Sequence, residues 1–243
     1  MDFATLKTIQ KNFTKELQSA KEGKKSSLSF ITHQLPAFAL VKENDIFQVL
    51  VIGGSISKNA LIKKTGNNID ILSDKQKDQP PFTTKAAFLA FVEKELVPEI
   101  SVLAVNFAYP LVPIYTGQKL EGVFIAGSKE NTFDGMKEKN VCREIEEYVL
   151  QKKNKHISVT IANDSICLLL SGLTENSWNH LACSIIGTGL GAALFLDKRT
   201  LVNIEPANFN KFPQSKEAIK IDKFSARPET WLFEKEISGA YLF

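Results

Sequence analysis

The sequence predicts an α/β protein that consists of one β-β-β-α-β-α-β-α unit followed by the beginning of a second unit of the same kind. Two observations lead to this prediction. Short β-branched and apolar runs alternate with segments of helical periodicity from residue 46 to residue 171, and the same order starts again after residue 181. A glycine-rich turn also follows the first strand of each unit, at Gly53-Gly54 and at Gly187–Gly191.

A helix and a three-stranded meander form the first part of the chain. Apolar residues recur at helical spacing from Phe3 to Leu17 and stop at Gly23, which predicts an amphipathic N-terminal helix. Three extended runs with glycine turns then follow the LPAF segment. They are predicted as strands at Ile46–Ile52, Ala60–Lys64 and Asn68–Leu72.

Helices and strands alternate in the rest of the first unit. Thr83 or Thr84 caps a helix that reaches Leu96. A polar loop is predicted at Gly127–Lys139. The remaining elements are strands at Ser101–Phe107, Leu120–Ile125 and Ile157–Ala162, and helices at Val141–Lys152 and Ser165–Ser171. This order is the layout of the ribonuclease H-like α/β fold.

The second unit begins with three predicted strands and one helix. They are placed at Ala182–Ile186, Ala192–Leu196, Leu201–Ile204 and, for the helix, Pro228–Tyr241. Two ribonuclease H-like lobes that face one cleft define the actin-like ATPase and kinase architecture. The sequence therefore predicts this architecture with a second lobe that is cut short, which leaves apolar faces open to self-association or to a partner.

Composition excludes several classes of function. The chain of 243 residues is 44% hydrophobic and 23% charged, and 30 basic against 27 acidic residues give a net charge of +3, so no basic surface predicts binding to nucleic acid or to a membrane. Cys142, Cys167 and Cys183 are scattered, which predicts buried thiols in the cytoplasm. The sequence shows no signal peptide or membrane span, and its isolated histidines predict no metal site.

The two glycine-rich turns are candidate phosphate-binding loops. Gly53, Gly54, Gly187 and Gly189 allow backbone N–H groups to approach phosphate oxygens, and the hydroxyls of Ser55 and Thr188 can add donors. Taken alone, the first turn is also explained as a hairpin, and the second as a dinucleotide-binding loop. The second turn lacks the GxGxxG spacing, however, and precedes a strand. Their matching positions in two repeats favour the clamping of one nucleotide.

Asp164 is the candidate general base. It follows a buried strand and begins a helix at the junction of the two units, a position where α/β sheets present residues to a cleft. A carboxylate there can accept the proton of an attacking hydroxyl. Helix capping by Asn163-Asp164-Ser165 is the alternative explanation. Further polar residues with the hydrogen-bonding groups that a sugar requires are Ser128, Lys129, Asn163, Glu205 and Glu234.

From about Ser29 to Leu242 the chain resembles the eukaryotic-type hexokinases. The matching segments stand in the family's order: LPAF, VLVIGGS, NFAYPL, GSKENTF, IANDS, IIGTGLGAALF, VNIEPANF and WLFEKEISGAYL. The resemblance implies an ATP- and Mg²⁺-dependent hexose phosphotransferase of glycolysis, with Asp164 as the base. By residue match, it implies sugar contacts from Ser128, Lys129, Asn163, Glu205 and Glu234. It also implies an N-terminal helix and linker at 1–35, a small sugar-binding lobe at 36–164 and a partial nucleotide-side lobe at 165–243.

Four positions depart from the family pattern. Val51 replaces an aspartate that organises the magnesium shell, Ala108 replaces a serine, Gly127 a tryptophan and Gly191 an asparagine. The family also continues beyond the point matched by Phe243. Two functions therefore remain open: a hexokinase, whole or as a fragment, and a hexokinase-like sugar-binding or regulatory protein without catalysis. A structural member of the actin-like superfamily is a third, weaker alternative.

Overall fold

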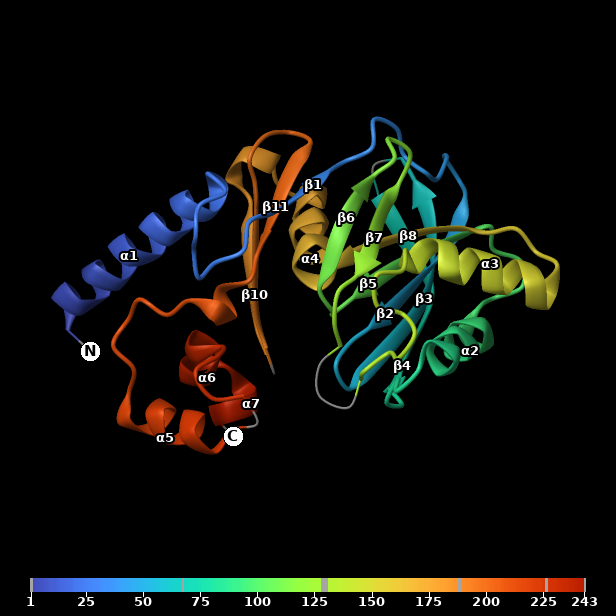
Figure 1. The fold of residues 1–243 in the computed structure, drawn as a ribbon. Helices are drawn as coiled ribbons and strands as arrows, with labels where there is room; N and C mark the ends of the chain where they lie inside the picture. Colours follow the sequence, from blue (N-terminus) through green and yellow to red (C-terminus); the bar gives the residue numbers. More distant parts are fainter. Residues whose placement is uncertain (1, 67, 128–130, 188, 226, 243) are drawn as a thin grey trace.

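The computed structural model describes residues 2–66, 68–127, 131–187, 189–225 and 227–242. These residues form a five-stranded sheet, a four-stranded sheet and a two-stranded hairpin. Figure 1 shows the two larger sheets side by side, each with its own helices. The chain thus has the two-lobed arrangement that the repeated order of elements predicts.

The first sheet has the strand order β4-β3-β2-β5-β8. Its strands are β2 (Ile46–Ile52), β3 (Ile56–Thr65), β4 (Asn68–Asp78), β5 (Val102–Phe107) and β8 (Ser158–Asn163). The first three form an antiparallel meander, whereas β5 runs parallel to β2, and β8 runs parallel to β5. The carboxyl ends of the parallel strands therefore meet at one edge of the sheet, where β8 leads directly into helix α4 (Asp164–Ser171).

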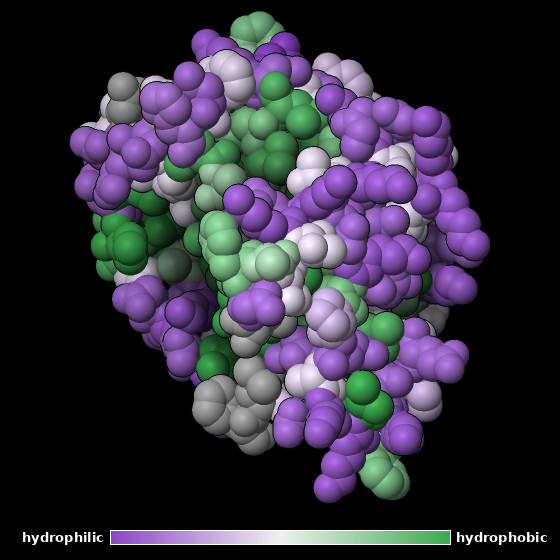
Figure 2. All heavy atoms as spheres, turned by 90° about the vertical axis from the view of Figure 1, so that its left-hand side faces the viewer, coloured by the Kyte–Doolittle hydropathy of each residue, from purple (hydrophilic) through white to green (hydrophobic). Residues whose placement is uncertain are grey.

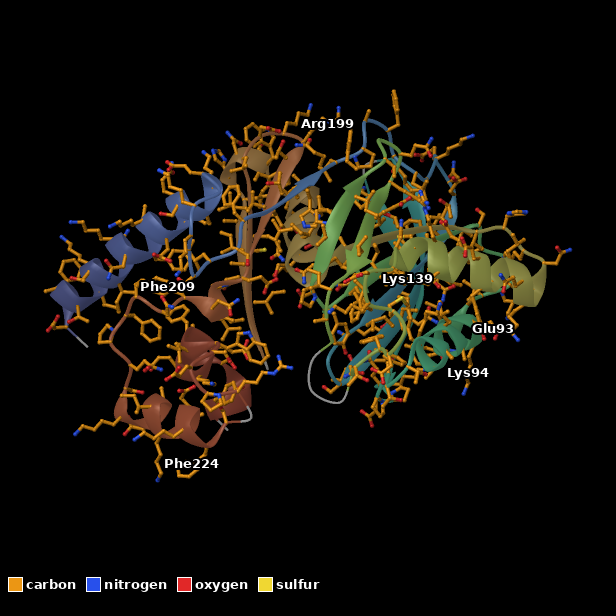
Figure 3. All side chains as sticks on the ribbon, in the orientation of Figure 1. Glu93, Lys94, Lys139, Arg199, Phe209 and Phe224 are labelled. Atoms are coloured by element: carbon orange, nitrogen blue, oxygen red, sulfur yellow. The ribbon has the colours of Figure 1, made fainter. Side chains whose placement is uncertain are left out.

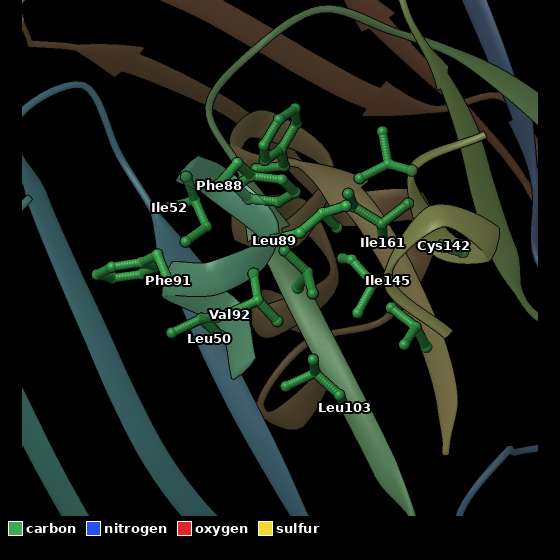
Figure 4. Close-up of a cluster of buried hydrophobic side chains, with 14 of the residues drawn as sticks. Leu50, Ile52, Phe88, Leu89, Phe91, Val92, Leu103, Cys142, Ile145 and Ile161 are labelled. Atoms are coloured by element: carbon green, nitrogen blue, oxygen red, sulfur yellow. The ribbon is translucent and has the colours of Figure 1, made fainter. Parts of the chain in front are cut away.

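Helices α2 (Lys85–Glu95) and α3 (Val141–Lys153) pack on one face of this sheet. Alternate residues of β2 are buried, so Leu50 and Ile52 point into the core, where they pack with residues such as Phe88 of α2 and Ile145 of α3 (Figure 4). Each large apolar side chain that is fully buried contributes about 1.5–3 kcal/mol. Thr84 caps α2 as predicted, because its Oγ1 accepts a hydrogen bond from the Ala87 backbone N at 3.1 Å.

An aromatic cluster extends this core toward the loop that precedes α3. The Phe133 ring lies 4.8 Å from that of Tyr109 and 5.0 Å from that of Phe124, measured between centroids. Phe133 is only 1% exposed, although its backbone has a positive φ of 51°. Phe124 ends β7 (Leu120–Phe124), which forms the hairpin with β6 (Leu111–Tyr115). The packing of the Phe133 ring in this cluster therefore fixes the described part of the loop.

The second sheet has the order β1-β11-β10-β9 and is antiparallel throughout. Its strands are β1 (Ile31–Gln34), β9 (Ala182–Ile186), β10 (Leu190–Phe195) and β11 (Thr200–Ile204). Helix α1 (Phe3–Lys21) covers one face, where Phe13 packs near Val202 and Ile204, and α4 covers the other face near Leu201. The N-terminal segment thus supplies one strand of this sheet, which the sequence pattern did not predict. The limits of the lobes at residues 36 and 164 stay predictions.

The C-terminal helices differ from the prediction. The expected helix at Pro228–Tyr241 is wrong in its extent, because α6 (Leu232–Ile237) begins only after a turn and is separated from α7 (Gly239–Leu242) at Ser238. Glu229 and Trp231 adopt positive φ angles of 62° and 49°, which are incompatible with a continuous helix. A further helix, α5 (Lys216–Phe224), precedes this turn and was missed.

The surface is mostly hydrophilic with separate apolar patches, as the face in Figure 2 shows. Figure 3 shows Phe224 pointing outward at the end of α5, whereas Phe209 points inward among the elements of the second lobe. Phe224 is 83% exposed and Ile186 of β9 is 63% exposed. Association of the chain through its exposed apolar residues stays a prediction. Within the described ranges, no helix combines the length and the apolar character needed to cross a lipid bilayer.

Candidate functional site

A cleft of about 570 Å³ lies between the two lobes. Its walls come from the β2–β3 turn, the end of β5, the β8–α4 junction, the β9–β10 turn, the segment after β11, and the C-terminal helices. The volume falls in the range of about 300–1,000 Å³ that is typical of small-molecule sites. Its polar lining includes Asn163, Asp164, Glu205, Asn208 and Glu234.

Asn163 and Asp164 are held where β8 ends and α4 begins. Asn163 Oδ1 accepts a hydrogen bond from the Ser165 backbone N at 2.9 Å and caps the helix. Asp164 Oδ1 accepts from the same N at 2.8 Å. Burial raises the pKa of Asp164 above its usual value, and hydrogen bonds from Ser165 and Asn163 oppose this shift. The structure therefore places a helix cap and a fixed carboxylate of increased basicity together at the cleft, and the role of Asp164 as a general base stays a prediction.

Glu205 lies directly after β11 on the opposite wall. Asn203 Nδ2 donates a hydrogen bond to its Oε1 at 2.9 Å. Burial is the main cause of the raised pKa of Glu205, and the negative charges of Asp164 and Glu234 raise it further. This coupling places the carboxylates of Asp164 and Glu234 each within interaction range of Glu205. A ligand with several hydroxyl groups can donate hydrogen bonds to such a set of acceptors.

Glu234 comes from α6 and lies beside the second glycine turn. A Cβ atom on Gly189 would lie 3.5 Å from Glu234 Oε2. The adjacent helix α7 is tied to the same turn, because the Gly239 backbone N donates to Gly187 O at 2.7 Å. Tyr241 of α7 also lines the cleft, and burial together with the charge of Glu234 raises its pKa.

The two glycine turns both line the cleft, with Gly53 and Gly54 on one side and Gly187 and Gly189 on the other. The carbonyl of Gly53 accepts hydrogen bonds from Tyr109 Oη at 3.0 Å and from Gln79 Nε2 at 2.7 Å, which fixes the first turn. Gly53 N donates to Ile56 O at 3.1 Å and Gly187 N donates to Gly189 O at 3.0 Å, so these two N–H groups close their turns. An anionic group would meet the N–H groups of Gly54 and Gly189 instead.

Among the remaining predicted site residues, the structure describes Ser55. Ser55 is exposed and is not among the lining residues. Ser128, Lys129 and Thr188 lie outside the described residues.

Sequence reasoning missed several polar or aromatic residues of the cleft, among them Asn131, Trp231 and Tyr241. Asn131 anchors the loop there, because its Oδ1 accepts from the Phe82 backbone N at 2.9 Å and its Nδ2 donates to Gly54 O at 3.4 Å. Trp231 and Tyr241 belong to the broken C-terminal helix region. Both residues lie in a segment that was predicted as one continuous helix, so no turn at the cleft was expected there. Only the residue pattern before Glu234 could have indicated this turn.

Two departures from the family pattern have a local explanation. A Cβ atom on Gly127 would lie 1.7 Å from Asn131 O, so the loop packs too closely for any side chain there. A Cβ atom on Gly191 would lie 2.3 Å from Ser165 Oγ. Ala108 lines the cleft without offering a hydrogen-bonding side chain.

The residues present do not form a protein site for a metal ion. Val51 lies beside Asn106 in the sheet, and the buried Asn106 Oδ1 has no hydrogen-bond partner. Among the described residues, no group of three or more histidine, cysteine or acidic side chains has the arrangement of a metal site. Because valine has no donor atom, the position of the expected magnesium-organising aspartate cannot serve that function.

Solved structures define the class of protein. The chain superimposes on a crystal structure of hexokinase with a TM-score of 0.69 and 19% identity, covering 97% of this chain and 59% of that chain. Hexokinase from Schistosoma mansoni complexed with glucose gives a TM-score of 0.69 and 17% identity, with coverage of 99% and 61%. The two lobes thus have the actin-like ATPase fold of these solved structures, and the predicted fold class is confirmed.

Sequence relatives narrow the class. The chain is 25% identical to Hexokinase-2 of Candida albicans over 276 residues, covering 98% of this chain and 56% of the relative. It is also 25% identical to the hexokinase of Kluyveromyces lactis, with the same coverage. No protein-family model matches the chain. The chain is thus similar to the N-terminal half of hexokinases, and it spans about half the length of the curated relatives it matches.

Proposed function

We propose that this chain is the hexose-binding half of a hexokinase-like kinase, which transfers the γ-phosphate of ATP to the 6-hydroxyl of a glucose-type hexose. The observation that carries the proposal is the convergence of Asn163, Asp164, Glu205 and Glu234 in one cleft between the lobes. Amide and carboxylate groups on opposite walls suit a polyol, whose hydroxyls need hydrogen-bond partners in several directions. A role in cytoplasmic glycolysis forms part of the same proposal.

In this mechanism Asp164 is the general base. It accepts the proton of the attacking hydroxyl as the hexose oxygen bonds to the γ-phosphorus and the bond to the departing ADP breaks. Asn163, Glu205 and Glu234 orient the sugar, and Ser128 and Lys129 add further sugar contacts.

The glycine turns hold the phosphates on the other side of the reacting hydroxyl. The backbone of Gly53, Gly54, Gly187 and Gly189 lines the cleft from two walls. The N–H groups of Gly54 and Gly189, with the hydroxyl of Thr188, bind the phosphate oxygens of ATP, which supplies the phosphoryl group. Gly53 N and Gly187 N are bonded within their own turns, and Ser55 does not line the cleft. Closure of the lobes excludes water from the sugar and protects the phosphoryl group from hydrolysis.

A specific observation favours a second function, a non-catalytic hexose-binding or regulatory protein. Kinases rely on Mg²⁺ to offset phosphate charge, but Val51 offers no ligand, and the described residues lack a metal-binding group. We therefore assign no step to a protein-bound metal. Under this second function, the sugar site is retained while phosphoryl transfer is lost.

Calorimetric titration with glucose, followed by an ATP-coupled assay of sugar phosphate, tests both functions. Binding with turnover supports the kinase, whereas binding without turnover supports the second function. If turnover is present, Asp164→Asn should abolish it and leave the fold intact; normal turnover by this variant would exclude Asp164 as the base. Absence of hexose binding by the unchanged protein would exclude both functions.

A further inference from the structure

The turn between α5 and α6 forms part of the cleft wall in an unfavourable backbone conformation. Glu229 and Trp231 have positive φ angles of 62° and 49°. This region is disfavoured for residues with a side chain, and for a bulky aromatic residue it is a true outlier. Trp231 nevertheless lines the cleft with Glu234. Conformations of this kind persist only where surrounding contacts enforce them.

A buried ion pair supplies those contacts. Lys235 is 1% exposed, and its Nζ lies 2.5 Å from Asp222 Oδ1 and donates a second hydrogen bond to Arg227 O at 2.8 Å. The Asp222 carboxylate also accepts from the Glu229 backbone N, at 3.0 Å through Oδ1 and 3.1 Å through Oδ2. One charged pair therefore binds the backbone of the turn at two points and joins α5 to α6.

The ion pair affects both Trp231 and Glu234, which line the cleft. Glu234 precedes Lys235 in α6, so immobilising the ammonium group immobilises the same helical turn. Arg227 carries the carbonyl that Lys235 holds, and its guanidinium carbon lies 5.0 Å from the centroid of the Trp231 ring. Fixing Arg227 and Glu229 therefore restricts the position of the indole as well.

Stability alone is a poor explanation of this arrangement. Lys235 is buried and Asp222 is half-buried, so bringing the ammonium group out of water costs desolvation energy, and a packed apolar pair of similar size is often equally stable. The pair is better explained by the geometry that it imposes on the turn. An indole ring offers a flat apolar surface to the C–H face of a sugar, while Glu234 accepts hydrogen bonds from its hydroxyls.

We infer that Asp222 and Lys235 are positioning residues that hold Trp231 and Glu234 in the conformation that contacts a hexose. The inference rests on the proposed hexose site and adds Trp231 to it. It predicts that releasing the turn weakens hexose binding even when the folded state remains stable.

The test uses intrinsic fluorescence. The sequence contains two tryptophans, so Trp178→Phe leaves Trp231 as the single reporter. In this background, glucose should change the Trp231 emission. Asp222→Asn should weaken glucose binding about tenfold or more, which corresponds to about 1.4 kcal/mol per factor of ten. Glu144→Gln is the matched control, because it breaks the 2.8 Å ion pair with Lys85 in the other lobe and should leave the affinity unchanged.

Two further variants separate positioning from stability. Asp222→Asn with Lys235→Met removes both charges, so it should recover the thermal stability that Asp222→Asn loses, yet its glucose affinity should remain reduced. Trp231→Ala, with the ion pair intact, should weaken binding about tenfold by calorimetry. Wild-type affinity in the stable double variant would overturn the positioning role, and unchanged affinity in Trp231→Ala would overturn the hexose contact. If the unchanged protein does not bind glucose, the proposed function itself fails, and the inference fails with it.

Discussion

The contact between Gly191 and Ser165 allows a sharp test of how the cleft is packed. A Cβ atom on Gly191 would lie 2.3 Å from Ser165 Oγ but 3.7 Å from Ser165 Cβ, so only the hydroxyl oxygen obstructs it. Ser165 is 1% exposed, which limits the alternative positions of its side chain. Overpacking of this kind costs about 1–3 kcal/mol. We expect Gly191→Ala to destabilise the protein by that amount.

Removal of the hydroxyl should cancel most of this cost. The Ser165 hydroxyl makes a long 3.5 Å hydrogen bond to Asp164 Oδ1, so Ser165→Ala alone should cost about 0.5–1.5 kcal/mol. In that background, the methyl group at position 191 would lie 3.7 Å from the remaining Cβ, an ordinary van der Waals contact. Gly191→Ala should then be almost neutral, and the double-mutant cycle should give a coupling energy of about 1–3 kcal/mol.

Urea unfolding of the four proteins, followed by circular dichroism, measures this coupling. Gly187→Ala is the control, because a Cβ atom there would have no heavy atom within 4 Å. It should change the free energy of unfolding by less than about 0.5 kcal/mol. If Gly191→Ala costs the same with and without the Ser165 hydroxyl, the clash is not the reason for glycine at this position.

Three other substitutions test the core, the charges and a helix cap. Phe133→Ala, which removes a ring that is 1% exposed, should cost about 3–5 kcal/mol in urea unfolding, whereas Phe224→Ala at an 83% exposed position should cost less than about 0.5 kcal/mol. Glu205→Gln should increase stability at pH 7, because the raised pKa means that ionisation opposes folding. The difference from wild type should shrink as the pH falls through the raised pKa of the folded state toward 4.5, the reference pKa, and should be lost below 4.5, where both states bind the proton. Asn140→Ala should lower the free energy of unfolding by about 1–2 kcal/mol, because it removes the N-cap of α3. The Asn140 Oδ1 atom accepts a hydrogen bond from Cys142 N at 3.0 Å. A cost below about 0.3 kcal/mol in a thermal melt would contradict this role.

The strands that sequence periodicity located well are those with a buried face. In β2 the alternation of buried and partly buried residues leaves a clear pattern, and the predicted range Ile46–Ile52 is the range in the structure. β4 is exposed along its whole length, so its residues from Ser73 to Asp78 carry no apolar signal, and the predicted strand ended too early. This part of the strand is specified by its pairing with β3. The four-residue β1 is likewise specified by a distant partner, β11.

The helical prediction failed where a side chain outside the predicted helix, seven residues before its backbone partner, controls the backbone. The segment from Pro228 to Tyr241 has a helical composition, but the Asp222 carboxylate binds the Glu229 backbone N and supports a turn instead. Interactions of this kind depend on tertiary structure and leave no periodic signal. The same turn places Trp231 at the cleft, so the missed break and the missed lining residue have one cause.

The residues of the candidate site likewise differed in whether the local sequence could locate them. Asp164 could be located from local sequence, because the end of a buried parallel strand determines where it lies. Glu205 and Glu234 could be selected only by resemblance, since nothing in the surrounding sequence distinguishes them from surface acids. The proximity of Glu205 and Glu234 depends on two elements of the second lobe, the segment after β11 and helix α6, which both line the cleft.

The three carboxylates concern hexose binding, whereas phosphoryl transfer makes a separate demand on the fold. Burial and mutual repulsion raise the pKa of Glu205, so the folded protein keeps this charge at a cost in stability. A fold under no demand other than stability would favour neutral residues there, which is why the cluster supports a hydroxyl-rich ligand. Val51 bears on a different step, because the family pattern implies at this position an aspartate that organises the magnesium shell, and the three carboxylates of the cleft are present without it. Loss of turnover with retained hexose affinity is therefore a coherent state of this site, and the paired glucose and ATP measurements distinguish it from an active kinase.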